Sequence, residues 1–122
     1  MSAPKITQNP MYQLLRHERV TEFNDRRAAG EAVDLAHCDF RSLDLRGWNA
    51  KGLDLTGAYF RGADLRGIDF TETTMDGVSI ATAKISGCKF PLQIPAQEIM
   101  LSLQFGTRMR YFPQCSCQDK TK

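Results

Sequence analysis

The sequence predicts an all-β repeat fold in which strands of three residues alternate with corners of two residues. Seven of the nine glycines lie at separations that are multiples of five, beginning with Gly47 and ending with Gly87. Residues 33–92 divide into twelve consecutive pentads without an insertion. No proline lies between Pro10 and Pro91, and the stretch is rich in apolar residues, so it is not a flexible linker.

Each pentad begins with an apolar, a polar and an apolar residue. All twelve third places are apolar, and eleven of the twelve first places are apolar or carry a thiol, whereas aspartate leads the second place. This alternation directs the first and third side chains inward and the second side chain outward. The predicted core comprises Leu35, Phe40, Leu45, Trp48, Leu55, Phe60, Leu65, Phe70, Met75, Ile80, Ile85 and Phe90.

The fourth and fifth places of each pentad are predicted to form the corners. A period of five residues fits neither a helix nor an uninterrupted strand. A glycine at every fifth position would also cost a helix about 1 kcal/mol each time. Glycine instead suits a corner that requires a positive φ or a close approach of backbone segments.

The units ADLRG, LDLTG, LDLRG and CDFRS resemble the A(D/N)LXX motif of the pentapeptide-repeat family. The resemblance covers residues 33–92, about half of the chain. It implies an all-β solenoid, a right-handed quadrilateral β-helix with one pentad on each side and four pentads in each coil. Twelve pentads then give about three coils of twenty residues.

Residues that lie twenty positions apart should stack in columns along such a coil. In one column, the large Trp48 and the small Ala50 share a pentad and complement each other in volume, as close packing in a narrow tube requires. The other members of this column are Phe70 and Phe90. The remaining expected columns are Leu45, Leu65 and Ile85; Phe40, Phe60 and Ile80; and Leu35, Leu55 and Met75.

Residues 1–32 are predicted to form an N-terminal helical cap, because the open end of a stack exposes apolar side chains and unpaired backbone. Asn9 and Pro10 are suited to begin a first helix. Thr21 is expected to cap a second helix, which Gly30 should end. The apolar residues expected to cover the first coil are Met11, Leu14, Leu15, Val20 and Phe23.

Residues 93–112 are predicted to form a C-terminal cap. A helix should run from Ala96 to Phe105 and end at Gly106, followed by a short extended segment. Residues 113–122 are expected to be a flexible tail.

The charges of the chain are nearly balanced, with sixteen basic and fourteen acidic residues and a formal net charge of +2. This balance argues against a polybasic nucleic-acid binder and against a wholly acidic surface. Four outward arginines should stack in pairs at the corners, as a ladder for an acidic partner or phosphates: Arg41, Arg46, Arg61 and Arg66. Alternatively, they pair with the neighbouring Asp39, Asp44 and Asp64 in surface ion pairs.

The sequence favours neither an enzyme nor a cofactor or metal protein. Motifs for phosphate loops, zinc proteases and nucleophile elbows are lacking. Cys115 and Cys117 form a C-x-C pair without a second pair nearby, and structural zinc requires four ligands. Cys38 and Cys88 occupy inward places and are expected to be small core residues. His17 and His37 are expected to be solvated.

The chain shows no signal-peptide pattern and no apolar run long enough to span a membrane. We therefore expect a cytoplasmic protein with free thiols. The favoured function is a non-enzymatic protein–protein interaction or scaffolding module. Its C-terminal region carries surplus apolar residues and is a candidate surface for a homodimer: Ile99, Met100, Leu103, Phe105, Tyr111 and Phe112.

Two alternatives remain open. The family resemblance implies a DNA mimic that modulates DNA gyrase or topoisomerase. Three coils would span only about 14 Å, or about four base pairs, and the mixed charge does not match an acidic duplex. In the second alternative, the arginines contact the phosphates of a nucleic acid.

Overall fold

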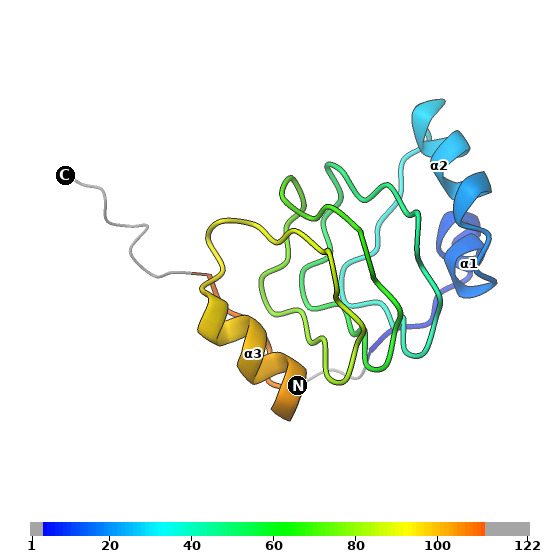
Figure 1. The fold of residues 1–122 in the computed structure, drawn as a ribbon. Coiled ribbons are helices and arrows are strands. Elements are labelled where there is room, and N and C mark those ends of the chain that lie inside the picture. The colour runs from blue at the N-terminus through cyan, green and yellow to red at the C-terminus, as the bar shows by residue number, and fades with distance from the viewer. Residues whose placement is uncertain (1–3, 112–122) are drawn as a thin grey trace.

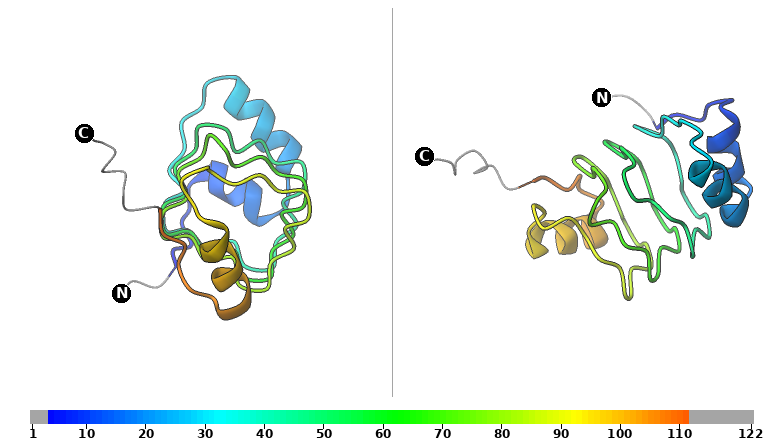
Figure 2. Two further views of the ribbon diagram at one scale, coloured as in Figure 1. Left: turned by 60° about the vertical axis from the view of Figure 1, so that its left-hand side comes forward. Right: turned by 90° about the horizontal axis from the view of Figure 1, so that it is seen from above.

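The computed structural model describes residues 4–111, in which three helices flank a stack of coils (Figure 1). Parallel bridges join second-place residues that lie twenty positions apart, such as Asp39 with Tyr59 and Tyr59 with Ser79. Successive coils superpose when the stack is viewed from one end (Figure 2, left). The expected coil of twenty residues is therefore present.

The bridges within residues 4–111 are isolated, and no regular strand is formed there. The expected β-strands are thus not confirmed. The pentad explains the difference, because the ladder is interrupted by a two-residue turn after each second-place bridge. Each side of the coil consequently contributes one paired residue rather than a run of them.

The corners are hydrogen-bonded turns at the fourth and fifth places. The N–H of a first-place residue donates across the corner to the third-place carbonyl of the preceding pentad, as from Leu53 to Ala50 at 3.0 Å. Ten of the twelve fifth-place residues, all except Glu72 and Leu92, adopt a positive φ, for example 77° at Gly52, as the third residue of a type II turn does. Three residues that are not glycine share this conformation: His37, Ser42 and Thr82.

Aspartate in the second place has a structural role that sequence reasoning missed. Its carboxylate accepts the N–H of the fourth-place residue and so supports the corner, as in an Asx turn. Asp54 accepts from Thr56 at 3.0 Å, and Asp69 accepts from Thr71 at 2.9 Å. The acceptors of this kind are Asp34, Asp39, Asp44, Asn49, Asp54, Asp64 and Asp69.

The interior of the stack contains the predicted core. Ten of the twelve predicted residues are buried, whereas Ile85 and Phe90, in the second half of the last coil, are half-buried. Phe40 stacks on Phe60 with ring centroids 4.9 Å apart, and Phe70 stacks on Phe90 at 6.0 Å. These contacts confirm two of the expected columns.

The N-terminal cap consists of α1 (Pro10–Arg16) and α2 (Val20–Ala28). Asn9 caps α1 as predicted, accepting the N–H groups of Met11 and Tyr12. The prediction that Thr21 caps α2 is wrong, because α2 begins one residue earlier and its N-cap, Arg19, makes no side-chain hydrogen bond. Gly30 ends the helix region as predicted, with a φ of 97°.

Both helices of this cap pack on the first coil, and α1 lies across its open end (Figure 2, left). The buried Tyr12 hydroxyl donates to the carbonyl of Asp39 at 2.6 Å. Phe23 of α2 meets Trp48 edge-on, with ring centroids 6.0 Å apart. Lys5 adds a parallel bridge beneath Cys38, so backbone as well as side chains covers this end.

The C-terminal cap begins with α3 (Ala96–Phe105), whose bounds and terminal glycine match the prediction. Ser102 is buried, and its hydroxyl accepts the N–H of Ile80 at 2.9 Å. The following segment pairs with the last coil through Met109, which exchanges backbone hydrogen bonds with Gly77 and Val78. This cap therefore covers the edge of the coil near residues 73–82.

The rest of the last coil is not covered in the same way. Among residues 4–111, the N–H groups of Ile85, Gly87 and Phe90 have no hydrogen-bond partner. Their equivalents one coil earlier, Leu65, Gly67 and Phe70, all donate to the next coil. We call residues 83–90 the open edge.

Within the described residues, no helix is long and apolar enough to cross a membrane.

Candidate interaction surface

Two of the predicted arginines lie on one side of the stack and are neutralised by aspartates. Arg46 contacts Asp44 at 2.9 Å and Asp64 of the next coil at 3.4 Å, while Arg66 contacts Asp64 at 2.7 Å. Hydrogen bonds from Arg66 hold the pKa of Asp64 at about 2, and those from Arg46 lower the pKa of Asp44. This side therefore presents alternating, mutually satisfied charges rather than a basic ladder.

Arg41 is also paired. Its guanidinium contacts Asp39 at 2.9 Å, and the Asp39 side chain is buried. The guanidinium carbon of Arg41 lies 5.8 Å from the centre of the Tyr59 ring, within the range of a cation–π contact. The Asp39 carbonyl accepts a long hydrogen bond of 3.5 Å from Arg16 of α1.

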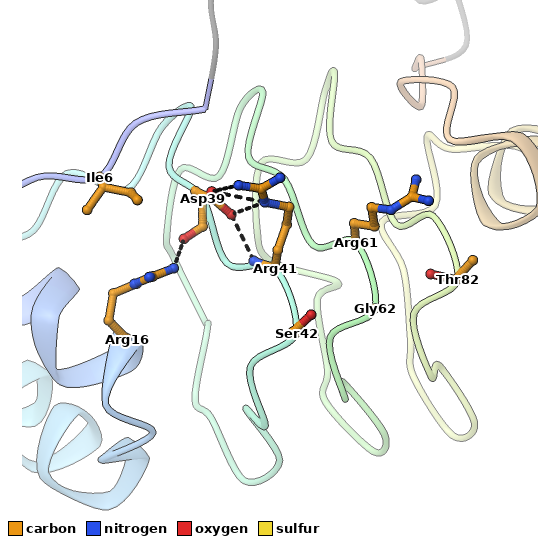
Figure 3. Close-up of a pocket in the computed structure, with 8 residues that line it drawn as sticks. All are labelled: Ile6, Arg16, Asp39, Arg41, Ser42, Arg61, Gly62 and Thr82. Atoms are coloured by element: carbon orange, nitrogen blue, oxygen red, sulfur yellow. Dashed lines mark hydrogen bonds and ion pairs between the residues drawn. The ribbon is translucent and has the colours of Figure 1, made fainter.

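Arg61 differs from the other three predicted arginines. Its side chain is exposed, and neither its guanidinium nor its backbone N–H has a hydrogen-bond or ion-pair partner among residues 4–111. The place two residues earlier, which holds aspartate before the other three arginines, is occupied by Tyr59. In Figure 3 the Arg61 side chain extends from the next coil and points away from the Asp39–Arg41 pair.

Arg61 lies in an open groove of about 500 Å³. Three coils contribute to the groove, together with α1 and the segment before it (Figure 3). Three arginines and one aspartate among the lining residues give the groove a net charge of +2. The lining residues are Ile6, Arg16, Asp39, Arg41, Ser42, Arg61, Gly62 and Thr82.

The four predicted arginines thus divide into three that are paired and one that is not. The alternative in which arginines pair with neighbouring aspartates describes Arg41, Arg46 and Arg66. Of the four arginines predicted to form a ladder for a partner, only Arg61 is left without an aspartate. The sequence carried a signal for this difference, because Tyr59 interrupts the Asp-x-Arg pattern of the other three corners.

The residues predicted for a dimer surface differ in their exposure to solvent. Ile99, Leu103 and Tyr111 are half-buried and pack against the core as part of the C-terminal cap. Met100 and Phe105 are exposed. Phe112 lies outside the described residues.

Two further apolar residues are exposed at the C-terminal end, and sequence reasoning did not select them. Leu101 lies four residues before Phe105, so the two share one face of α3. Leu92, just beyond the open edge, is 93% exposed, and Phe105 is 71% exposed. We call Leu92, Met100, Leu101 and Phe105 the C-terminal apolar patch.

The cysteines and histidines considered in the sequence analysis do not form a site within the described residues. Cys38 is buried and Cys88 half-buried; both are free thiols, and burial raises the pKa of each. His17 and His37 are exposed. Among residues 4–111, no three His, Cys, Asp or Glu residues form a cluster suited to a metal ion. Cys115 and Cys117 lie outside the described residues.

The paired aspartates predict a loss of stability in acid. A carboxylate with a folded pKa of about 2 and an ordinary value of 3.8, as at Asp64, stabilises the fold above about pH 4. That stabilisation is lost as the pH falls through the folded pKa. We expect the urea midpoint, followed by circular dichroism, to fall between about pH 4 and about pH 2. The fall should be smaller in Asp64→Asn; an equal fall would contradict the assignment.

Comparison with known proteins identifies the repeated segment. The family model described as Pentapeptide repeats (8 copies) matches residues 31–67 and 54–90. A search of curated proteins found no match, and a search of solved structures found none either. The two matched ranges overlap and together contain the corners, the stacked core and all four arginines discussed above. Through residues 31–90, the chain belongs to the pentapeptide-repeat family.

Proposed function

We propose that the chain is a non-enzymatic protein–protein interaction or scaffolding module, built on the right-handed quadrilateral β-helix that is typical of pentapeptide repeats. Membership in the family supports a repeat protein of this kind. The stack holds its side chains at fixed spacing, since its corners are braced by backbone hydrogen bonds and seven of them also by a second-place aspartate or asparagine. Such a surface is suited to binding a partner without large rearrangement.

We further propose that the chain forms a homodimer through its C-terminal end. The observation that carries this proposal is the coincidence of the C-terminal apolar patch with the open edge. Both features lie at the same end of the stack, whereas the opposite end is covered by α1, α2 and the Lys5 bridge (Figure 2). A second copy would cover apolar side chains and unpaired N–H groups together.

Size-exclusion chromatography with light scattering tests the dimer. The wild-type chain should elute with twice the monomer mass, and the double variant Leu101→Glu/Phe105→Glu should elute as a monomer with an unchanged circular dichroism spectrum. Ile6→Glu is the matched control, because Ile6 is also an exposed apolar residue but lies at the N-terminal side. A wild-type chain that stays monomeric at high concentration would overturn the proposal.

The charge arrangement gives less support to DNA mimicry. A mimic needs a continuous acidic surface, but Asp39, Asp44 and Asp64 are each paired with arginine. A supercoiling assay with purified DNA gyrase separates the two functions. Inhibition by the protein at micromolar concentration would favour mimicry over the interaction module.

A further inference from the structure

We propose that Arg61 forms a docking site for a carboxylate of an acidic segment in a partner protein. The inference rests on the interaction function proposed above and specifies the chemistry of one partner. It does not depend on the homodimer, because none of the residues that line the groove belongs to the C-terminal apolar patch.

The first argument comes from the other three arginine corners. In each, the backbone N–H and Nε of the arginine donate to the same aspartate oxygen, two residues earlier. The two distances are 2.9 and 3.0 Å at Arg41, 3.2 and 3.0 Å at Arg46, and 3.3 and 2.9 Å at Arg66. An arginine in the fourth place of this repeat therefore creates a two-donor unit that binds a carboxylate.

Arg61 provides the same donors in the same place of the repeat, but Tyr59 replaces the aspartate. The Tyr59 ring lies against the guanidinium of Arg41 in the preceding coil and supplies no carboxylate. Neither donor of Arg61 finds an acceptor among residues 4–111. A carboxylate from another protein can satisfy both donors with the geometry that the neighbouring corners already display.

The surroundings of Arg61 favour an acidic ligand. The groove carries a net charge of +2, and the hydroxyl of Ser42, one of its lining residues, has no hydrogen-bond partner among the described residues. Ser42 and Thr82 occupy corner positions with φ values of 61° and 54°, where most other corners of the stack have glycine. Left-handed backbone at residues other than glycine is strained and is often retained at binding sites. The Thr82 hydroxyl donates to Ala81, so Ser42 is the available donor of the two.

A nucleic acid is a poorer occupant of this groove. Binding to a phosphate backbone requires several unpaired basic side chains along the surface. Arg41, Arg46 and Arg66 are each engaged by aspartate, which leaves one fully available guanidinium in this part of the repeat. A single carboxylate, carried by an acidic segment of a protein, can be bound by this one available guanidinium.

The test uses the full ¹⁵N-labelled chain and a hexaglutamate peptide as the probe, followed by amide chemical shifts. We expect saturable shifts at Ser42, Arg61, Gly62 and Thr82. The variant Tyr59→Asp restores the Asp-x-Arg pattern and should give Arg61 an internal partner, so hexaglutamate binding should be lost. Tyr59→Phe is the control, because it keeps the ring and gives Arg61 no acceptor, and it should retain binding.

A second pair of variants separates the site from general attraction. Arg61→Gln and Arg66→Gln remove the same charge from neighbouring corners of the same coil. We expect Arg61→Gln to weaken binding roughly tenfold, the loss of one charge-assisted pair, and Arg66→Gln to change it little. Equal losses in the two variants would show attraction by net charge alone and would overturn the site.

Two further outcomes would also overturn it. Inorganic phosphate that displaces hexaglutamate at lower concentration than glutarate does would assign the site to phosphate rather than carboxylate. Binding of a short DNA duplex, weakened equally by Arg61→Gln and Arg66→Gln, would assign both arginine corners to nucleic acid. Failure of hexaglutamate to bind a chain that still dimerises would remove this inference alone, since light scattering reports the other proposal independently.

Discussion

Replacing Trp48 with alanine should lower the free energy of unfolding by about 3–5 kcal/mol, the typical cost of removing a large buried aromatic side chain. Trp48 is 3% exposed and contacts aromatic rings from the N-terminal cap and from the first two coils. The ring centroids lie between 5.9 and 6.4 Å from that of Trp48, at Phe23, Phe40, Phe60 and Phe70. Its loss would loosen the cap and the stack together. Urea unfolding followed by circular dichroism measures the change.

Trp48→Phe keeps the prediction testable if the alanine variant does not fold. Within the described residues, Trp48 Nε1 is buried and has no hydrogen-bond partner. Phenylalanine removes this unsatisfied donor, which offsets part of the lost packing, so the cost should stay below about 1.5 kcal/mol. Ile6→Ala, at an exposed position outside the proposed dimer surface, should change stability by less than about 0.5 kcal/mol. A loss at Trp48→Ala as small as that at Ile6→Ala would contradict the central role of the indole.

Replacing Gly57 with alanine should cost about 2–3 kcal/mol. Gly57 has a φ of 69°, and a side chain in the left-handed region costs about 1–2 kcal/mol. A Cβ there would also overlap the His37 ring of the preceding coil, with Cε1 only 2.6 Å away. Forcing His37 from its rotamer adds about 0.5–1.5 kcal/mol.

Gly47→Ala provides the matched control for Gly57→Ala. Gly47 has a φ of 85°, but a Cβ there would meet no atom within 4 Å, so only the backbone strain remains. The difference between the two variants should vanish when His37→Ala is added to Gly57→Ala. Equal costs at both glycines in the presence of His37 would show that the close approach contributes nothing.

The pentad pattern was sufficient to predict the corners, the core and the period of the coil, because each depends on local alternation repeated twelve times. The stacked Phe40–Phe60 and Phe70–Phe90 pairs follow directly from that period. The end of α1 could not be predicted in the same way. It depends on Glu18, whose φ of 60° is unusual for a residue that is not glycine. The sequence offers no glycine there to mark the end.

The interaction surface was predictable only in part. The sequence places four arginines at corners, but their pairing depends on distances both within a coil and between coils. Arg46, for instance, reaches Asp64, eighteen residues later, at 3.4 Å. Likewise, apolar composition alone did not distinguish the half-buried Ile99 from the exposed Leu101 on the same helix. That distinction depends on which face of α3 lies against the last coil.

The unequal ends of the stack also limit how far association can proceed. A solenoid with two open ends could add copies head to tail and grow into a filament. Here α1, α2 and the Lys5 bridge occupy the first coil, so a neighbour's open edge finds no matching edge at that end. The homodimer proposed above would therefore not extend into a filament, because the N-terminal cap blocks the addition of a third chain.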